Sequence, residues 1–115
     1  LLLRAMAVSP NAPTNQADCA LARPVDPAMF SEIIRHIGIV KETITPTLGM
    51  RVGKYGRTTA YTEANITLLN ATVNITYNTS GGRQRVARFV GQVISEAMSE
   101  GGDSGSLVVS TADRK

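Results

Sequence analysis

Alternating apolar and polar positions mark the clearest predicted strand of this chain, between residues 66 and 77. From residue 71 onward the odd-numbered positions are apolar or aromatic, and they are Ala71, Val73, Ile75 and Tyr77. Thr and Asn occupy the even-numbered positions between them. Because successive side chains of a strand point to opposite faces, this period of two predicts one face packed on a core and one face in solvent.

Further short apolar segments predict that most of the chain is built from strands. They span residues 1–8, 16–22, 37–40, 50–59, 83–94 and 107–109. Within 83–94 the positions expected to face inward are Val86, Phe89 or Val90, and Val93 or Ile94. Residues 28–36 fit either a short helix or a strand. Short strands at regular spacing are typical of an antiparallel barrel or sandwich, so the predicted fold class is all-β.

Composition limits the size of the protein and its classes of partner. The chain has 115 residues, of which 43% are apolar, and this is enough for one globular domain with a modest core. The net charge is only +3, and its dense cluster of Arg83, Arg85 and Arg88 lacks interleaved aromatic residues. We therefore expect a solvated strand or loop edge there and no nucleic-acid partner. No apolar run reaches the length of a membrane span, so no membrane partner is expected either.

Cys19 is the only cysteine, which excludes a disulfide within the chain. It lies in segment 16–22, which we expect to be a short buried strand. A lone Cys among Ala and Leu is usually a small buried hydrophobic residue. The neighbouring Asp18 has two interpretations, either a turn cap at a strand edge or a partly buried carboxylate with a partner.

The stretch with the most chemistry is Glu100–Ser106, in which Ser104 lies between Asp103 and Gly105. A serine hydroxyl is a weak nucleophile, which needs a neighbouring base and a tight turn that presents it. Gly102 lets the backbone approach a substrate carbonyl, so the amides of Gly102 and Ser104 could form an oxyanion hole. Asp103 could act as a buried anion that fixes the loop. Gly, Asp and Ser are also ordinary turn residues, so this stretch alone fits a plain turn as well.

Three stretches together resemble the trypsin-like serine peptidases, which have the chymotrypsin fold. Gly102-Asp103-Ser104-Gly105-Ser106 is similar to the nucleophile loop of that family. Ala17-Asp18-Cys19-Ala20-Leu21-Ala22 is similar to the segment with its catalytic aspartate. Gly56-Arg57-Thr58-Thr59 resembles the Lys-x-Gly-Arg-Thr-Thr-Gly segment of a bacterial and fungal branch. The three stretches follow the family's order, and the resemblance covers nearly the whole chain.

The resemblance implies a fold of two β-barrels with the active site between them. Residues 1–27 would be the end of the first barrel and the linker, and residues 28–115 would be most of the second barrel. Asp18 would orient a histidine, Ser104 would attack the scissile bond, and the amides of Gly102 and Ser104 would stabilise the oxyanion. The implied activity is that of a serine endopeptidase acting on peptides or proteins, without a metal or cofactor. An extracellular location fits the family.

The general base is the largest departure from the family. The family's catalytic histidine precedes the aspartate in the chain, whereas His36, the only histidine here, follows Asp18. We expect His36 to be a surface residue without a catalytic role. We also expect the chain to be a fragment, with the catalytic histidine upstream of Leu1 and the last strands beyond Lys115.

The resemblance also implies a substrate preference. In the family, the base of the primary pocket lies six positions before the nucleophilic serine, which here is Met98. A methionine there implies a preference for apolar or aromatic side chains.

One rival function is a catalytically inactive peptidase-like domain that binds partners. The other is an unrelated small β-barrel, in which Gly-Asp-Ser-Gly is a turn.

Overall fold

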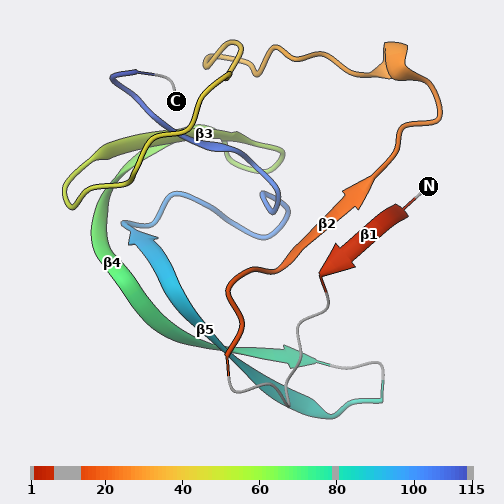
Figure 1. The fold of residues 1–115 in the computed structure, drawn as a ribbon, viewed down its shortest axis with the longest axis vertical. Helices are drawn as coiled ribbons and strands as arrows, with labels where there is room; N and C mark the ends of the chain where they lie inside the picture. The colour runs from red at the N-terminus through yellow and green to blue at the C-terminus, as the bar shows by residue number, and fades with distance from the viewer. Residues whose placement is uncertain (1, 7–13, 79–80, 114–115) are drawn as a thin grey trace. The chain divides into compact units, whose positions relative to one another are not determined.

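The computed structural model describes residues 2–6, 14–78 and 81–113 (Figure 1). These residues form six strands and one short 3-10 helix, and no α-helix is found among them. The elements are β1 (Leu2–Met6), β2 (Cys19–Ala22), η1 (Pro27–Met29), β3 (Arg51–Gly56), β4 (Ala60–Asn78), β5 (Gln84–Ser95) and β6 (Val108–Ser110). The predicted all-β class is therefore confirmed at the level of a mostly β chain.

The strands belong to two sheets and the chain to two compact units. One sheet pairs β1 with β2, and the other has the order β5-β4-β3-β6. The first unit comprises Leu1–Val25 and Asn70–Gln92, and the second comprises Asp26–Leu69 and Val93–Lys115. The predicted domain boundary after residue 27 stays a prediction, and each unit is described by itself below.

In the first unit, β1 and β2 form an antiparallel ribbon in which Met6 pairs with Cys19. All four residues of β2 are exposed, so the prediction that segment 16–22 and Cys19 are buried is wrong. The physical reason is that an isolated two-stranded ribbon offers too little apolar surface to bury its side chains. The buried side chains of this unit lie instead on β5, where Ala87 and Phe89 are 2% and 3% exposed.

In the second unit, β3 is the central strand and pairs antiparallel with β4 and β6. The tight β3–β4 hairpin closes at the Gly56–Ala60 pair, and Val52 lies opposite Ser110 of β6. The buried apolar side chains of this unit come from both sides of the hairpin, from β6 and from one preceding turn. They are Ile37, Val52, Ala64, Ile66 and Val109.

Residues with left-handed backbone angles change which positions face inward along β4 and β5. Asn70 of β4 has a φ of 53°, and Gly91 of β5 has a φ of 68°. Before Asn70 the even-numbered Ala64 and Ile66 of β4 are buried, whereas after it Ala71 is half-buried. Such a local change of conformation re-aims the side chains that follow, as a β-bulge does.

The predicted faces of the long strands are therefore confirmed only in part. After Asn70, the odd-numbered Ala71, Val73 and Tyr77 are half-buried as expected, but Ile75 is exposed. On β5, Phe89 faces inward, which is one of the two expected alternatives, and of Val93 and Ile94 it is Ile94 that is half-buried. Val86 is exposed, so the prediction that it faces inward is wrong. The physical reason is that Ala87 and Phe89 fill the inward face, and Gly91 then shifts the alternation.

Between β2 and β3 the chain has little regular structure. The segment 28–36 contains only the end of η1, and segment 37–40 is not a strand. Instead, Ile34 and Gly38 exchange backbone hydrogen bonds of 3.0 and 2.8 Å across a tight turn. Left-handed φ angles at His36 and Gly38 make this turn possible, and Ile37 enters the core from it.

Candidate active site

The loop Glu100–Ser106 consists of two successive turns that leave Ser104 exposed. The Asp103 amide donates to the Glu100 carbonyl at 3.1 Å, and the Ser106 amide donates to the Asp103 carbonyl at 3.0 Å. The Ser106 hydroxyl donates to the same carbonyl at 2.6 Å. Gly102 and Gly105 have φ angles of 103° and 86°, which glycine adopts without steric cost. The loop therefore presents the Ser104 hydroxyl to solvent on a fixed backbone.

Asp103, the residue before this serine, is buried and is held by the β3–β4 turn. Its Oδ1 accepts hydrogen bonds from the amides of Thr58 and Thr59, at 2.7 and 3.2 Å. Its Oδ2 accepts from the Thr59 hydroxyl at 2.6 Å and from the Glu100 amide at 3.1 Å. The prediction that Asp103 is a buried anion fixing the loop agrees with this geometry.

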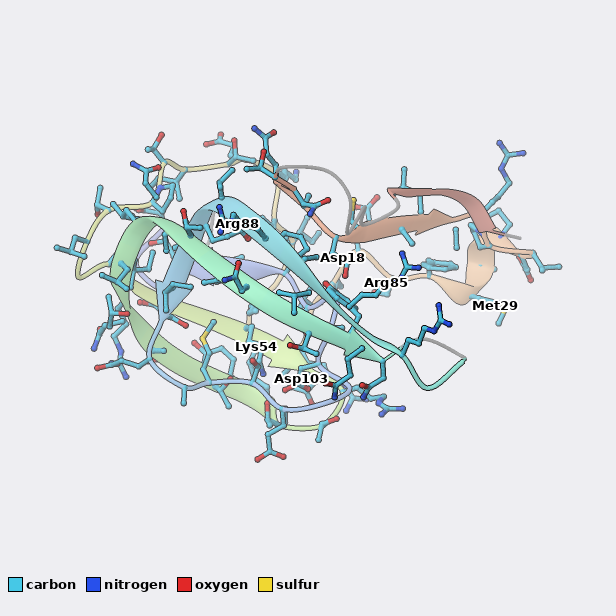
Figure 2. The ribbon with its side chains drawn as sticks, turned by 90° about the horizontal axis from the view of Figure 1, so that it is seen from below. Asp18, Met29, Lys54, Arg85, Arg88 and Asp103 are labelled. Atoms are coloured by element: carbon cyan, nitrogen blue, oxygen red, sulfur yellow. The ribbon has the colours of Figure 1, made fainter. Side chains whose placement is uncertain are left out.

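Lys54 of β3 provides the opposite charge. Its Nζ lies 3.2 Å from Asp103 Oδ2, and both side chains are only 2% exposed (Figure 2). The same Nζ donates to the Thr59 hydroxyl at 2.6 Å. Among the described residues, every buried side-chain nitrogen and oxygen has a hydrogen-bond partner. Lys54, Thr59 and Asp103 thus form a satisfied buried network, as buried charges require.

Hydrogen bonds to its carboxylate hold the pKa of Asp103 well below its ordinary value. The largest cause is the hydrogen bond from the Thr59 side chain, and the backbone amides of Glu100, Thr58 and Thr59 add to it. Burial acts in the opposite direction, because desolvation disfavours the charged form. Asp103 is therefore a carboxylate at neutral pH.

The β3–β4 hairpin also fixes the loop at further points. The Thr58 hydroxyl donates to the Gly101 carbonyl at 2.9 Å, and the Thr62 hydroxyl donates to the Met98 carbonyl at 2.7 Å. Gly56 permits the close approach, because a Cβ at this position would collide with the Asp103 side chain. The Gly-Arg-Thr-Thr segment and the Gly-Asp-Ser-Gly loop, far apart in sequence, thus form one structural unit.

The two amides expected to form an oxyanion hole are those of Gly102 and Ser104. Within the described part of the chain, neither amide donates a hydrogen bond to a protein acceptor. An oxyanion hole needs donors that stay free for the substrate, so this state is compatible with the expected role. The role itself stays a prediction.

Asp18, the expected partner of the catalytic histidine, lies in the first unit, whereas Ser104 lies in the second. Its carboxylate is exposed and accepts a hydrogen bond of 3.0 Å from the Tyr77 hydroxyl. The pKa of Tyr77 is raised, first by its partial burial and second by this contact with the Asp18 anion. The pairing of Asp18 with Ser104 through a histidine stays a prediction.

His36 is exposed, and its ring stacks on Tyr55 and lies tilted against Tyr61, both in the second unit. Its ring centroid lies 5.6 Å from that of Tyr55 and 5.8 Å from that of Tyr61. The Tyr61 hydroxyl donates to Glu63 at 2.7 Å, and Glu63 forms an ion pair with Arg51 at 2.8 Å. These two contacts hold the pKa of Glu63 below its ordinary value. The exposed position of His36 in this aromatic cluster fits the expected surface role.

The described residues contain neither a metal-binding cluster nor a membrane-spanning helix. No group of three or more His, Cys, Asp and Glu side chains that could hold a metal lies within 2–6, 14–78 and 81–113. No helix in the same ranges is long and apolar enough to span a membrane.

A largely apolar cavity of about 290 Å³ lies between segment 40–50 and the β3–β6 strands, and Ser104 does not line it. Met98 is half-buried near the loop, and its role as the pocket base stays a prediction.

No role in the site was predicted from the sequence for three residues that define its geometry: Lys54, Thr58 and Thr59. A signal for Lys54 was present, because it shares its strand face with Val52 and Gly56, which are both buried. A lysine in phase with buried positions needs a buried anion nearby. Comparisons with protein-family models, with curated proteins and with solved structures find no match for this chain.

Proposed function

We propose that this chain belongs to a serine endopeptidase of the trypsin-like type, with Ser104 as the nucleophile. The observation that supports the proposal is the buried Asp103, which the Gly-Arg-Thr-Thr turn and Lys54 hold while Ser104 stays exposed. A plain turn has no need of a buried ion pair, whose desolvation is costly. A nucleophile loop does need a rigid backbone, because its serine and oxyanion donors must keep their geometry during the reaction. The double β-barrel is part of the same proposal.

The proposed reaction is acyl transfer through a covalent intermediate. The Ser104 hydroxyl adds to the scissile carbonyl carbon while a histidine takes its proton, and the amides of Gly102 and Ser104 bind the resulting oxyanion. The C–N bond then breaks, and the leaving amine takes the proton from the histidine. Water hydrolyses the acyl-enzyme by the same route and releases the carboxylic acid. Asp18 would orient the histidine and stabilise its cationic form.

The proposed reaction also requires a general base, and the residues named above do not provide one. His36 lies against Tyr55 and Tyr61 in the second unit, and the proposal gives it no part in catalysis. The proposed mechanism therefore needs a histidine from outside these 115 residues. The activity belongs to the protein that contains this chain, and the present residues supply the nucleophile, the oxyanion donors and the orienting acid.

Covalent labelling tests this function directly. The protein that contains this chain is treated with a fluorophosphonate, which phosphonylates an activated serine, and the modified residue is located by mass spectrometry. We expect labelling at Ser104, its loss in Ser104→Ala and its retention in Ser99→Ala, the matched control at an exposed serine nearby. Absence of labelling on a folded protein that still binds peptides would favour the inactive binding domain instead.

A further inference from the structure

The guanidinium of Arg57 lies directly against Gly102 of the serine loop. The position that a Cβ of Gly102 would occupy is only 2.5 Å from Arg57 Nη2 and 2.5 Å from Thr58 Oγ1. Gly102 has a φ of 103°, so glycine is favoured there, and no side chain separates the cation from this part of the loop. Arg57 thus places a positive charge beside one of the two proposed oxyanion donors.

Arg57 has no anionic partner of its own among the described residues. The ion pairs found there join Arg51 to Glu63 and Lys54 to Asp103. Arg57 is exposed and donates no hydrogen bond to the described part of the chain. Asp103 cannot take this role, because Lys54, the Thr59 hydroxyl and three backbone amides already occupy its buried oxygens.

One edge of the serine loop therefore combines several unused donors. They are the Arg57 guanidinium and the amides of Gly102 and Ser104, and none of them has a protein acceptor within residues 2–6, 14–78 and 81–113. The oxyanion of the proposed reaction would use the two amides. The guanidinium would remain available to a second anionic group on the same substrate. A planar guanidinium suits a carboxylate, because its donors match the two oxygens in a bidentate arrangement.

We propose that Arg57 binds a carboxylate of the peptide that reacts at Ser104, and so selects peptides with an acidic group close to the scissile bond. The inference rests on the proposed function, because it takes the Ser104 loop as the place where a peptide binds. The carboxylate can come from an Asp or Glu side chain or from the C-terminus of the peptide. Both sources present the same chemistry to Arg57, and the experiment separates them.

The test measures peptide binding, so it does not depend on turnover. The chain is labelled with ¹⁵N and titrated with short N-acetylated peptides while the amide signals of Gly102 and Ser104 are followed by NMR. One peptide contains Glu and is amidated at its C-terminus, and a second contains Gln and is amidated. A third contains Gln and has a free C-terminal carboxylate. The titrations are repeated with Arg57→Gln and with Arg35→Gln, a matched loss of one exposed arginine in the same unit.

We expect at least one carboxylate peptide to bind the parent chain about three- to five-fold more tightly than the neutral peptide, as an exposed ion pair allows. This ratio should fall to about one in Arg57→Gln and stay unchanged in Arg35→Gln. The peptide that shows the effect identifies the source of the carboxylate. An equal ratio in the parent chain and in Arg57→Gln would overturn the inference. Failure of the fluorophosphonate reaction at Ser104 would instead overturn the proposed function, so the two failures are distinguishable.

Discussion

Lys54 Nζ lies 3.2 Å from Asp103 Oδ2, and these two charged side chains are as buried as the apolar core around them. The pair joins the central strand β3 to the loop with Ser104. Removing one partner of a buried pair leaves the other charge without compensation, which is far more costly than losing an exposed pair. The Lys54–Asp103 pair is therefore one of the contacts on which the geometry of the loop depends.

Replacing Lys54 tests this dependence. We expect Lys54→Met to lower the free energy of unfolding by about 3–5 kcal/mol, because the Asp103 carboxylate stays buried without its cation. The matched control is Arg51→Met on the same strand, which removes the exposed ion pair to Glu63 and should cost less than about 1 kcal/mol. Urea denaturation followed by circular dichroism measures both. Equal effects of the two variants would contradict the assigned role of the buried pair.

The lowered pKa of Asp103 predicts a loss of stability in acid. The ordinary pKa of the group is 3.8, and in the folded chain it is lower, so the unfolded chain takes up the proton first as the pH falls. The stabilisation is therefore complete well above pH 4 and declines progressively below about pH 4. Unfolding free energies measured from pH 6 to pH 2 should show this decline in the parent chain. Asp103→Asn should be less stable at neutral pH and show a smaller decline; an unchanged slope would exclude Asp103 as its source.

Much of the strand pattern could be predicted from the sequence, since the period of two is visible directly in the second half of β4. The exceptions arise where one residue changes the conformation. Asn70 and Gly91 adopt left-handed φ angles within long strands, and the alternation changes phase there. The presence of an asparagine or glycine inside a strand does not predict a change in which positions face inward, because either residue also fits a regular strand. The sequence therefore left open whether Val93 or Ile94 faces inward, and in the structure Ile94 is half-buried and Val93 exposed.

The candidate site was predictable in its parts but not in its connections. The sequence singled out the Ser104 loop and the Gly-Arg-Thr-Thr segment separately. Their connection depends on which atoms accept and donate, for example the two Thr59 donors to Asp103, and spacing along the chain contains no such information. The prediction that Cys19 is buried was wrong for a different reason. Its apolar neighbours suggested burial, but β2 pairs only with β1, and this leaves the strand exposed.

Gly56 and Gly101 form a matched pair for testing how closely the hairpin and the loop must approach. A Cβ at Gly56 would collide with the Asp103 side chain, whereas a Cβ at Gly101 would meet nothing within 4 Å. We expect Gly56→Ala to cost about 1–3 kcal/mol, as overpacking does, and Gly101→Ala to change stability by less than about 0.5 kcal/mol. Thermal denaturation of both variants measures the difference. A Gly56→Ala chain as stable as the parent would show that Asp103 can move without cost.

The contact between Tyr77 and Asp18 predicts a measurable change in the ionisation of the tyrosine. Burial is the larger cause of the raised pKa of Tyr77, and the Asp18 carboxylate adds to it. We therefore expect Asp18→Asn to lower the pKa of Tyr77, while leaving it above the ordinary value of 10.0. Phenolate absorbance in an alkaline titration measures this, and Tyr77→Phe assigns the transition among the three tyrosines. No change in Asp18→Asn would show that the two side chains do not meet in solution.

Replacing Met98 tests the substrate preference of the proposed peptidase. Its carbonyl accepts a hydrogen bond from the Thr62 hydroxyl at 2.7 Å, so β4 fixes the backbone at the proposed pocket base. A half-buried methionine there offers a polarizable apolar surface and no charge, so we expect cleavage after apolar or aromatic residues. Met98→Asp should shift the ratio of kcat/KM values toward Lys and Arg by about tenfold or more, because a charge-assisted contact contributes about 1.5–3 kcal/mol. A peptide library profiled with the protein that contains this chain measures the ratio. If the parent already prefers Lys or Arg, Glu100 would be the pocket carboxylate instead, and Glu100→Gln should then remove that preference.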